Sequence, residues 1–386
     1  MKNNTRGVSQ GWLRAGLLLL GWAWAVQGAY AGDASAKMPG QVSLSGTEFL
    51  RDGQPWVPRG VGITGLVLVD KLVASGKGRP PLIASHNMFG PALLDAVKAY
   101  GADSVRVAVS QPGLNPSDPL YDPGYADEVA QKIRLMRQRG LVVFVFMQWE
   151  PGTGSHNQSG LTSDPATLAA WHTLLHKLPL DDHGIVLEPL NEPNHRGEQG
   201  AAPGPQVWAS WQSGMQKLVN AIRGEGWSGV MLIDGAYGSS WLDGAPAISD
   251  PQKPSQLAWS VHVYFTKSFR FVSQPDWDQH FGDTCRAAAC VVTEFQAARH
   301  TDCSRKGNNR EMAEALVRYL KNRRIGLMPW AFDYENTMME GHSLSQTTRY
   351  PKIAKCNKDG DDEGENFGNG ELVHQYFTSG RVPEGG

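Results

Sequence analysis

Short apolar runs alternate with longer helical segments through most of this chain. The runs are rich in β-branched and other apolar residues, as buried strands are. They lie at residues 56–63, 104–109, 141–147, 185–190, 229–233, 258–264, 290–294 and 326–332. Between the second and third runs, Val129, Ile133 and Met136 recur at the spacing of one helix face. Eight such strand–helix units favour an α/β fold, a single (β/α)8 TIM barrel, over an open doubly wound sheet.

The segments outside this alternation complete the predicted fold. Residues 32–55 read as a short N-terminal β lead-in, with Asp52-Gly53 as a hairpin turn. Residues 65–89 and 341–370 are polar and glycine-rich, so we expect loops around the barrel mouth or its last helix. No Gly-x-Gly-x-x-Gly follows the first strand and no Gly-x-x-x-x-Gly-Lys-Ser/Thr occurs, so nucleotide-binding folds lack their phosphate cradle.

The first thirty residues resemble an export signal. Lys2, Arg6 and Arg14 precede an apolar run at 15–26, and Ala29-Tyr30-Ala31 has the small-x-small pattern of a cleavage site. The run is too short to span a bilayer, which takes about 20 residues, and no later stretch is longer. We therefore predict a secretory signal peptide at 1–31, a barrel domain at 32–386, no membrane span, and a secreted or periplasmic protein.

Charge and composition exclude other classes. Lys and Arg number 36 against 38 Asp and Glu, a net charge of -2, so the chain lacks the basic surface of a nucleic-acid-binding protein. With 41% hydrophobic and only 19% charged residues, it is not a disordered chain.

Four cysteines would meet an oxidising environment after export, which permits disulfides. Four cysteines allow three pairings, and proximity favours Cys285–Cys290, leaving Cys303–Cys356. The sequence contains no C-x-x-C motif and no Cys/His cluster, so a metal site is not expected. The acidic run at 359–364 reads as a solvated loop, because the twelfth loop position is Gly370 where an EF-hand needs Glu.

Polar side chains gather where the predicted strands end, which is the face that carries function in this fold. They are Arg106, Gln148, Trp149, Glu150, Asn191, Glu192, His262, Tyr264, Glu294, Trp330 and Asp333. Two carboxylates on different strand ends with aromatic rings around them are what a glycosidase needs.

The segments Leu187–Pro193 and Val291–Phe295 resemble the strand-four and strand-seven signatures of clan A glycoside hydrolases, and specifically of family 5, the cellulase family. Further segments resemble the family's other strands in the right order: Arg59-Gly60-Val61, Val105-Arg106-Val107, Val261-His262-Val263-Tyr264 and Met328-Pro329-Trp330. The resemblance implies a retaining double displacement on a β-glycoside, with Glu192 as general acid/base and Glu294 as nucleophile.

Retention implies carboxyl groups about 5–5.5 Å apart and no cofactor or metal. Arg106 and Tyr264 are expected to keep Glu294 ionised, and His262 shares the strand face of Tyr264. The resemblance implies that Asn191 contacts the 2-hydroxyl group of the sugar. Gln148, Trp149 and Trp330 complete the expected substrate-binding residues.

Several of these residues have simpler interpretations. A strand-end glutamate is often only ion-paired, Glu188 reads as a buried structural carboxylate, and Trp330 could be core packing. Trp149 is the best cleft candidate among the remaining tryptophans. The others, which could be sugar platforms or core, are Trp208, Trp211, Trp241 and Trp259.

One departure leaves the substrate open. Many family members carry a His-Asn pair after the third strand, whereas this chain has Met147-Gln148-Trp149. Endo-β-1,4-glucan, β-mannan, another β-glycan and bacterial exopolysaccharide all remain candidates. The expected partner is thus an uncharged polysaccharide or oligosaccharide, bound by a monomer. A catalytically silent glycan-binding barrel and a transglycosylase are the rival functions.

Overall fold

A computed structural model describes residues 38–74, 80–148, 165–193, 202–264, 273–296, 309–334, 337–341, 344, 349–353 and 368–383. Residues Met38–Gly386 form one compact unit. The predicted signal peptide lies outside the described residues. Among those described, no helix is both long and apolar enough to cross a bilayer.

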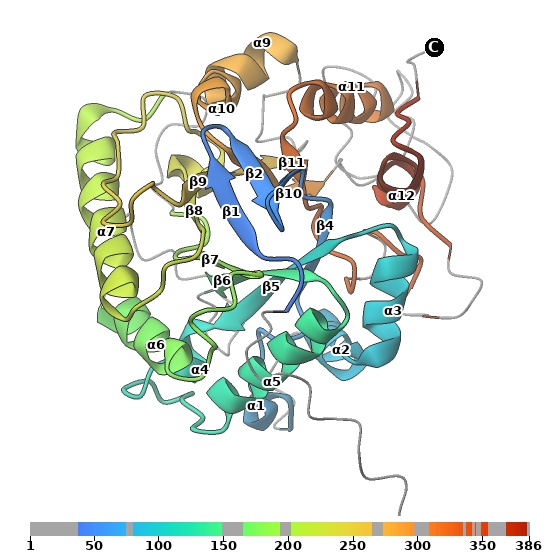
Figure 1. The fold of residues 1–386 in the computed structure, drawn as a ribbon. Helices are drawn as coiled ribbons and strands as arrows, with labels where there is room; N and C mark the ends of the chain where they lie inside the picture. The colour runs from blue at the N-terminus through green and yellow to red at the C-terminus, as the bar shows by residue number, and fades with distance from the viewer. Residues whose placement is uncertain are drawn as a thin grey trace, which may run out of the picture. The chain divides into compact units, whose positions relative to one another are not determined.

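Eight parallel strands form the central sheet, each beside its neighbour in the sequence. They are β4 (Gly60–Ile63), β5 (Ser104–Ser110), β6 (Val142–Gln148), β7 (Ile185–Glu188), β8 (Met231–Asp234), β9 (Leu257–Tyr264), β10 (Cys290–Gln296) and β11 (Gly326–Leu327). The edges meet, because Leu327 donates its N–H to the carbonyl of Pro58 at 3.0 Å and Gly62 donates to that of Pro329 at 2.9 Å. The predicted (β/α)8 barrel is confirmed (Figure 1).

Helices surround this sheet (Figure 1). The longer ones are α2 (Pro80–Met88), α3 (Pro91–Ala99), α5 (Tyr125–Gln138), α6 (Pro165–Leu175), α7 (Pro205–Gly224), α11 (Asn309–Asn322) and α12 (Gly370–Ser379). Short helical turns are α1 (Asp70–Ala74), α4 (Gln111–Leu114), α8 (Ala236–Ser239), α9 (Gln274–Trp277), η1 (Asp278–Gly282) and α10 (Thr284–Ala287). The predicted stripe of α5 is buried against the sheet, with Val129, Ile133 and Met136 at most 1% exposed.

Several predicted boundaries differ from the structure: β7 ends at Glu188, β8 begins at Met231, and β11 ends at Leu327 rather than at residue 332. Proline accounts for two further differences. The first strand begins at Gly60 because Trp56 belongs to a separate sheet and Pro58 has no N–H to donate. Residues 65–89 are not simply a loop, since they contain α1 and α2. Pro80 starts α2 with the backbone angle that the first turn of a helix needs.

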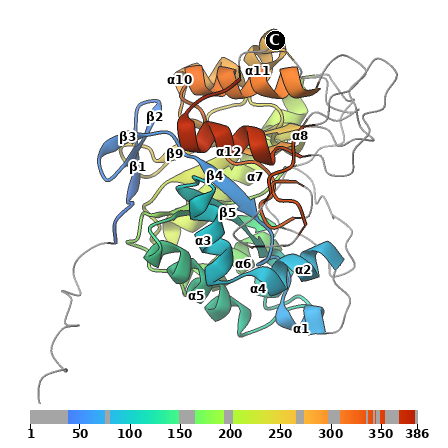
Figure 2. The ribbon, with the colours of Figure 1, turned by 90° about the vertical axis from the view of Figure 1, so that its right-hand side faces the viewer.

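The predicted β lead-in is an antiparallel sheet of β1 (Val42–Ser45), β2 (Glu48–Arg51) and β3 (Gln54–Trp56). Its second turn has positive φ at both Asp52 (50°) and Gly53 (76°), as a two-residue hairpin turn requires. Phe49 belongs to the same apolar cluster as Phe144 of β6. Figure 2 shows this small sheet at one end of the barrel and α1 and α8 at the other. The carboxyl ends of the barrel strands are therefore not covered by it.

One disulfide joins Cys285 of α10 to Cys290 at the start of β10, as predicted. The proposed partners Cys303 and Cys356 lie outside the described residues. The acidic run at 359–364 lies outside them as well.

The α5 stripe provides a test of the packing. We expect Ile133→Ala to lower the free energy of unfolding by about 2–5 kcal/mol, because it leaves a cavity between helix and sheet. The exposed neighbour Gln131→Ala is the control and should change it by less than about 0.5 kcal/mol. Urea denaturation measures both, and equal losses would contradict the buried face.

Candidate active site

A fully buried guanidinium stands at the centre of the barrel mouth. Arg106 of β5 donates through Nε and Nη2 to the carboxylate of Glu188, at 2.8 and 2.5 Å. Nη1 donates to Glu294 Oε1 at 2.7 Å, and Nη2 also donates to Asn191 Oδ1 at 2.6 Å. The guanidinium carbon lies 3.6 Å from the ring centroid of Phe146. Arg106 thereby connects β5 to β10, and to β7 and the turn after it.

Glu294 accepts hydrogen bonds on both carboxylate oxygens. Arg106 holds Oε1 and the Tyr264 hydroxyl donates to Oε2. Burial alone would raise the pKa of Glu294, but the charges of His262 and Arg106 and the Tyr264 hydrogen bond together lower it. This carboxylate is therefore held in its ionised form, as the sequence led us to expect.

Glu192 is in a different environment. Its backbone has a φ of 49°, in the left-handed region, and its N–H donates to Asp234 Oδ2 at 2.8 Å. Its Oε1 lies 2.9 Å from Nδ1 of His262, and its side chain is 37% exposed. One oxygen of Glu192 and one of Glu294 lie within 4.8 Å of each other. Two carboxylates thus face each other, one enclosed by donors and one open to solvent.

His262 lies among three acidic side chains. Its Nδ1 is 3.7 Å from Glu294 and its Nε2 is 3.9 Å from Asp234. Burial would lower the pKa of the ring, but the charge of Glu294, the hydrogen bond to Glu192 and the charge of Asp234 raise it to about 9. The ring is therefore an imidazolium at neutral pH.

A cavity of about 210 Å³ opens above these groups. Its lining includes both carboxylates together with Gln148, Asn191, Tyr264 and Trp330. Asn191 donates through Nδ2 to Oε1 of Gln148 at 2.8 Å, so both amides have fixed orientations. Trp330 is half-buried and packs edge-on against Phe146. The wall thus contains amides, hydroxyls, carboxylates and an indole, which are groups that bind sugars, beside the apolar side chains of Val67, Leu82 and Ala108.

Two groups of side chains bring ligand-type atoms close enough to hold a metal ion, but cationic side chains already pair with their carboxylates. Glu188, Asp234 and His262 bring three ligand-type atoms within 4.8 Å, and so do Glu192, His262 and Glu294. Glu188 is bound to Arg106, and the charged His262 serves both groups. The arrangement is an ion-paired carboxylate network.

Comparison with known sequences places this network in a family. The protein-family model described as cellulase (glycosyl hydrolase family 5) matches residues 84–336 of this sequence. The chain belongs to the cellulase family, glycosyl hydrolase family 5.

Two curated relatives are moderately similar. The β-mannanase/endoglucanase A of Caldicellulosiruptor saccharolyticus is 24% identical over 244 residues, which is 62% of this chain and 16% of that protein. Endoglucanase 1 of Ruminococcus albus is 25% identical over 198 residues, 49% of this chain and 47% of that protein. This family 5 chain therefore matches less than half the length of either relative.

Solved structures agree on the fold. A β-glucanase from Saccharophagus degradans has a TM-score of 0.58 at 17% identity, covering 80% of this chain and 91% of that one. The catalytic domain of an endoglucanase from Thermobifida fusca has a TM-score of 0.57 at 18% identity, covering 88% and 98%.

The structure brings together nearly all the site residues predicted from the sequence. They are Arg106, Gln148, Asn191, Glu192, His262, Tyr264, Glu294 and Trp330. Glu188 is buried and bound to Arg106, as its structural interpretation required. Trp149 lies outside the described residues.

The other tryptophans belong to the core. Trp208, Trp211 and Trp241 are buried, and Trp259 stacks on Trp211 with centroids 5.8 Å apart. Asp333 is also structural, because its carboxylate accepts the backbone N–H groups of Thr64 and Gly65.

The sequence interpretation missed Asp234. This fully buried carboxylate ends β8, accepts the N–H of Glu192 and lies beside His262. The signal was present, because Asp234 follows Met231-Leu232-Ile233 as the polar end of the fifth strand. Burial and the charge of Glu188 raise its pKa.

The raised pKa of His262 predicts a pH dependence. Because the folded value of about 9 exceeds the ordinary 6.5, the stabilisation from the charged ring is complete below pH 6.5 and is lost as pH rises through about 9. NMR of ¹⁵N-labelled histidine should give a His262 midpoint near 9, lower in Asp234→Asn, which lacks one neighbouring charge. A midpoint near 6.5 in the unmodified chain would contradict this network.

Proposed function

We propose that this protein hydrolyses β-glycosidic bonds of a polysaccharide by double displacement, with retention of the anomeric configuration. The main support is the approach of Glu192 and Glu294, whose oxygens lie within 4.8 Å across the cavity. Retaining glycosidases hold their carboxyl groups about 5–5.5 Å apart, whereas inverting enzymes leave about 6.5–9.5 Å for a water.

Glu294 is the proposed nucleophile. It attacks the anomeric carbon, and a glycosyl ester forms as the bond to the leaving oxygen breaks. Arg106 and Tyr264 maintain the negative charge that the attack requires. The same donors stabilise the carboxylate again when water displaces it from the sugar in the second step.

Glu192 is the proposed general acid and base. It donates a proton to the leaving oxygen in the first step and takes one from water in the second. His262 lies 2.9 Å from Oε1 of Glu192, so its positive charge stabilises the carboxylate left after proton donation. The exposed position of Glu192 gives both the leaving group and the water access to it.

The remaining lining residues are proposed to bind the sugar. Asn191 is fixed by Arg106 and Gln148, which suits an amide that must meet a hydroxyl in one orientation. Gln148 offers the sugar a second amide from the cavity wall. Trp330 offers an indole face to the sugar ring.

The substrate class proposed first is β-1,4-glucan, cleaved within the chain. Curated relatives are named endoglucanases, and a solved relative is described as a β-glucanase in complex with cellotetraose. β-Mannan is the second candidate, because one relative is named β-mannanase/endoglucanase.

Export is also part of the proposal. The signal-like segment at 1–31 and the disulfide Cys285–Cys290 both suit a secreted or periplasmic enzyme, since disulfides persist in oxidising compartments.

A polysaccharide panel tests the reaction and the substrate together. The purified chain should release oligosaccharides from soluble β-1,4-glucan or β-mannan, and ¹H NMR at early times should show the β-anomer first. An initial α-anomer would exclude retention. Binding to the glycans without product release would instead favour a silent binding barrel.

Removal of each carboxylate should separate their roles. Glu192→Gln and Glu294→Gln are each expected to lower kcat on the polysaccharide by at least about 1000-fold. An aryl glycoside whose leaving group needs no proton should still give a burst of aryl release with Glu192→Gln but none with Glu294→Gln. Glu48→Gln, an exposed residue of β2, is the control and should retain full activity. Unchanged turnover in either active-site variant would contradict the assignment.

A further inference from the structure

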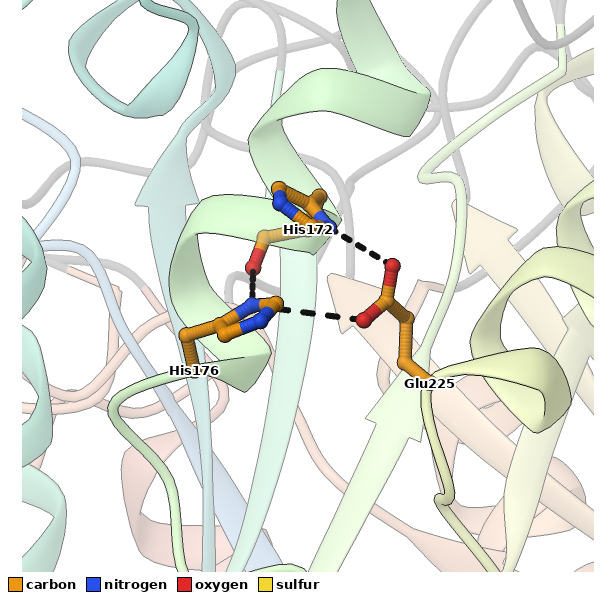
Figure 3. A group of neighbouring side chains, drawn as sticks. All are labelled: His172, His176 and Glu225. Atoms are coloured by element: carbon orange, nitrogen blue, oxygen red, sulfur yellow. Dashed lines mark hydrogen bonds and ion pairs between the residues drawn. The ribbon is translucent and has the colours of Figure 1, made fainter.

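A second cluster of ligand-type side chains lies on the outer layer of helices. His172 is in the last turn of α6, His176 is in the turn that follows, and Glu225 caps the C-terminal end of α7. Figure 3 shows the two imidazole rings and the carboxylate turned toward one another. One nitrogen of each ring and one oxygen of Glu225 lie within 4.8 Å of each other.

The contacts within this cluster are close to those around a metal ion. His172 Nδ1 is 2.7 Å from Glu225 Oε1, and His176 Nδ1 is 4.0 Å from Oε2. Bonds of about 2.1 Å in a tetrahedral site place neighbouring ligand atoms about 3.4 Å apart. The distance between His172 Nδ1 and Glu225 Oε1 therefore needs to grow by about 0.7 Å. The exposed His176 ring must turn so that its unprotonated nitrogen faces the ion.

The surroundings favour a cation here. Within the described part of the chain, no lysine or arginine lies within ion-pair distance of Glu225, whose ionic partners are the two histidines. The side chains of His172, His176 and Glu225 are 62%, 57% and 30% exposed, so an ion could enter and retain water as a further ligand. His176 Nδ1 donates to the carbonyl of His172 at 2.7 Å, so Nε2 is the nitrogen of that ring whose lone pair is left for an ion.

We propose that His172, His176 and Glu225 bind a divalent transition-metal ion of the zinc class. Two imidazoles and one carboxylate are nitrogen and oxygen ligands suited to Zn²⁺, whereas Ca²⁺ and Mg²⁺ prefer oxygen ligands alone. The ion joins the end of α6 to the end of α7.

The position assigns the ion a structural role. Helices of a (β/α)8 barrel run antiparallel to the strands, so their C-terminal ends lie at the face opposite the strand ends that carry Glu192 and Glu294. The segment enclosed between His176 and Glu225 includes β7 and the turn that bears Glu192. An ion that binds only the folded chain stabilises it by mass action and leaves the reacting groups untouched.

Calorimetry on the full chain tests the site. After EDTA treatment and removal of the chelator, titration with ZnCl₂ should show one strong site per chain, and the Tm should rise with Zn²⁺. His172→Ala and Glu225→Gln should each weaken binding at least about tenfold, and His172→Ala/His176→Ala should abolish both the heat and the Tm shift.

The matched control is His86→Ala, which removes the histidine of the other partly exposed group, formed with Asp70 and Glu128. It should leave zinc binding unchanged, because Glu128 of that group is already ion-paired with Lys132. Circular dichroism of each variant without metal checks that the substitutions preserve the fold, above all at His86, whose side chain is only 12% exposed. The proposal would be overturned if the double variant bound zinc as tightly as the unmodified chain. It would also be overturned if the unmodified chain bound no zinc at ZnCl₂ concentrations up to about 1 mM.

Discussion

The buried guanidinium of Arg106 is the interaction on which the barrel mouth depends. A fully buried charge is costly unless it is paired and hydrogen-bonded, and Arg106 meets both conditions with Glu188, Glu294 and Asn191. Its planar fork reaches three acceptors at once, which a lysine ammonium could not do in the same geometry. Strands β5 and β10 and the turn after β7 are therefore locked together by electrostatics.

This network gives two glutamates of one sheet different chemical properties. Glu294 is surrounded by donors and positive charge, which keep its proton off, while Glu192 meets one imidazolium and solvent. Both residues stand near the carboxyl ends of parallel strands, so the difference arises from the side chains that surround each of them. The small sheet at the opposite end adds packing without covering this mouth.

The alternation of strands and helices was readable from the sequence, and so were the polar residues at the strand ends, because burial and function impose regular patterns. The start of β4 and the helices at 70–88 were not, since proline and local packing decide them. Asp234 was missed because an apolar strand ending in one aspartate resembles many structural strands. His172 and Glu225 lie on different helices, so only the folded chain brings them together.

The left-handed backbone of Glu192 lowers the stability of the fold at the position that carries the proposed acid. A residue with a side chain in that region costs on the order of 1–3 kcal/mol, whereas glycine adopts it freely. Replacement by glycine would relax the turn after β7 while removing the proposed acid. Stability and the proposed chemistry therefore make opposite demands on the residue at position 192.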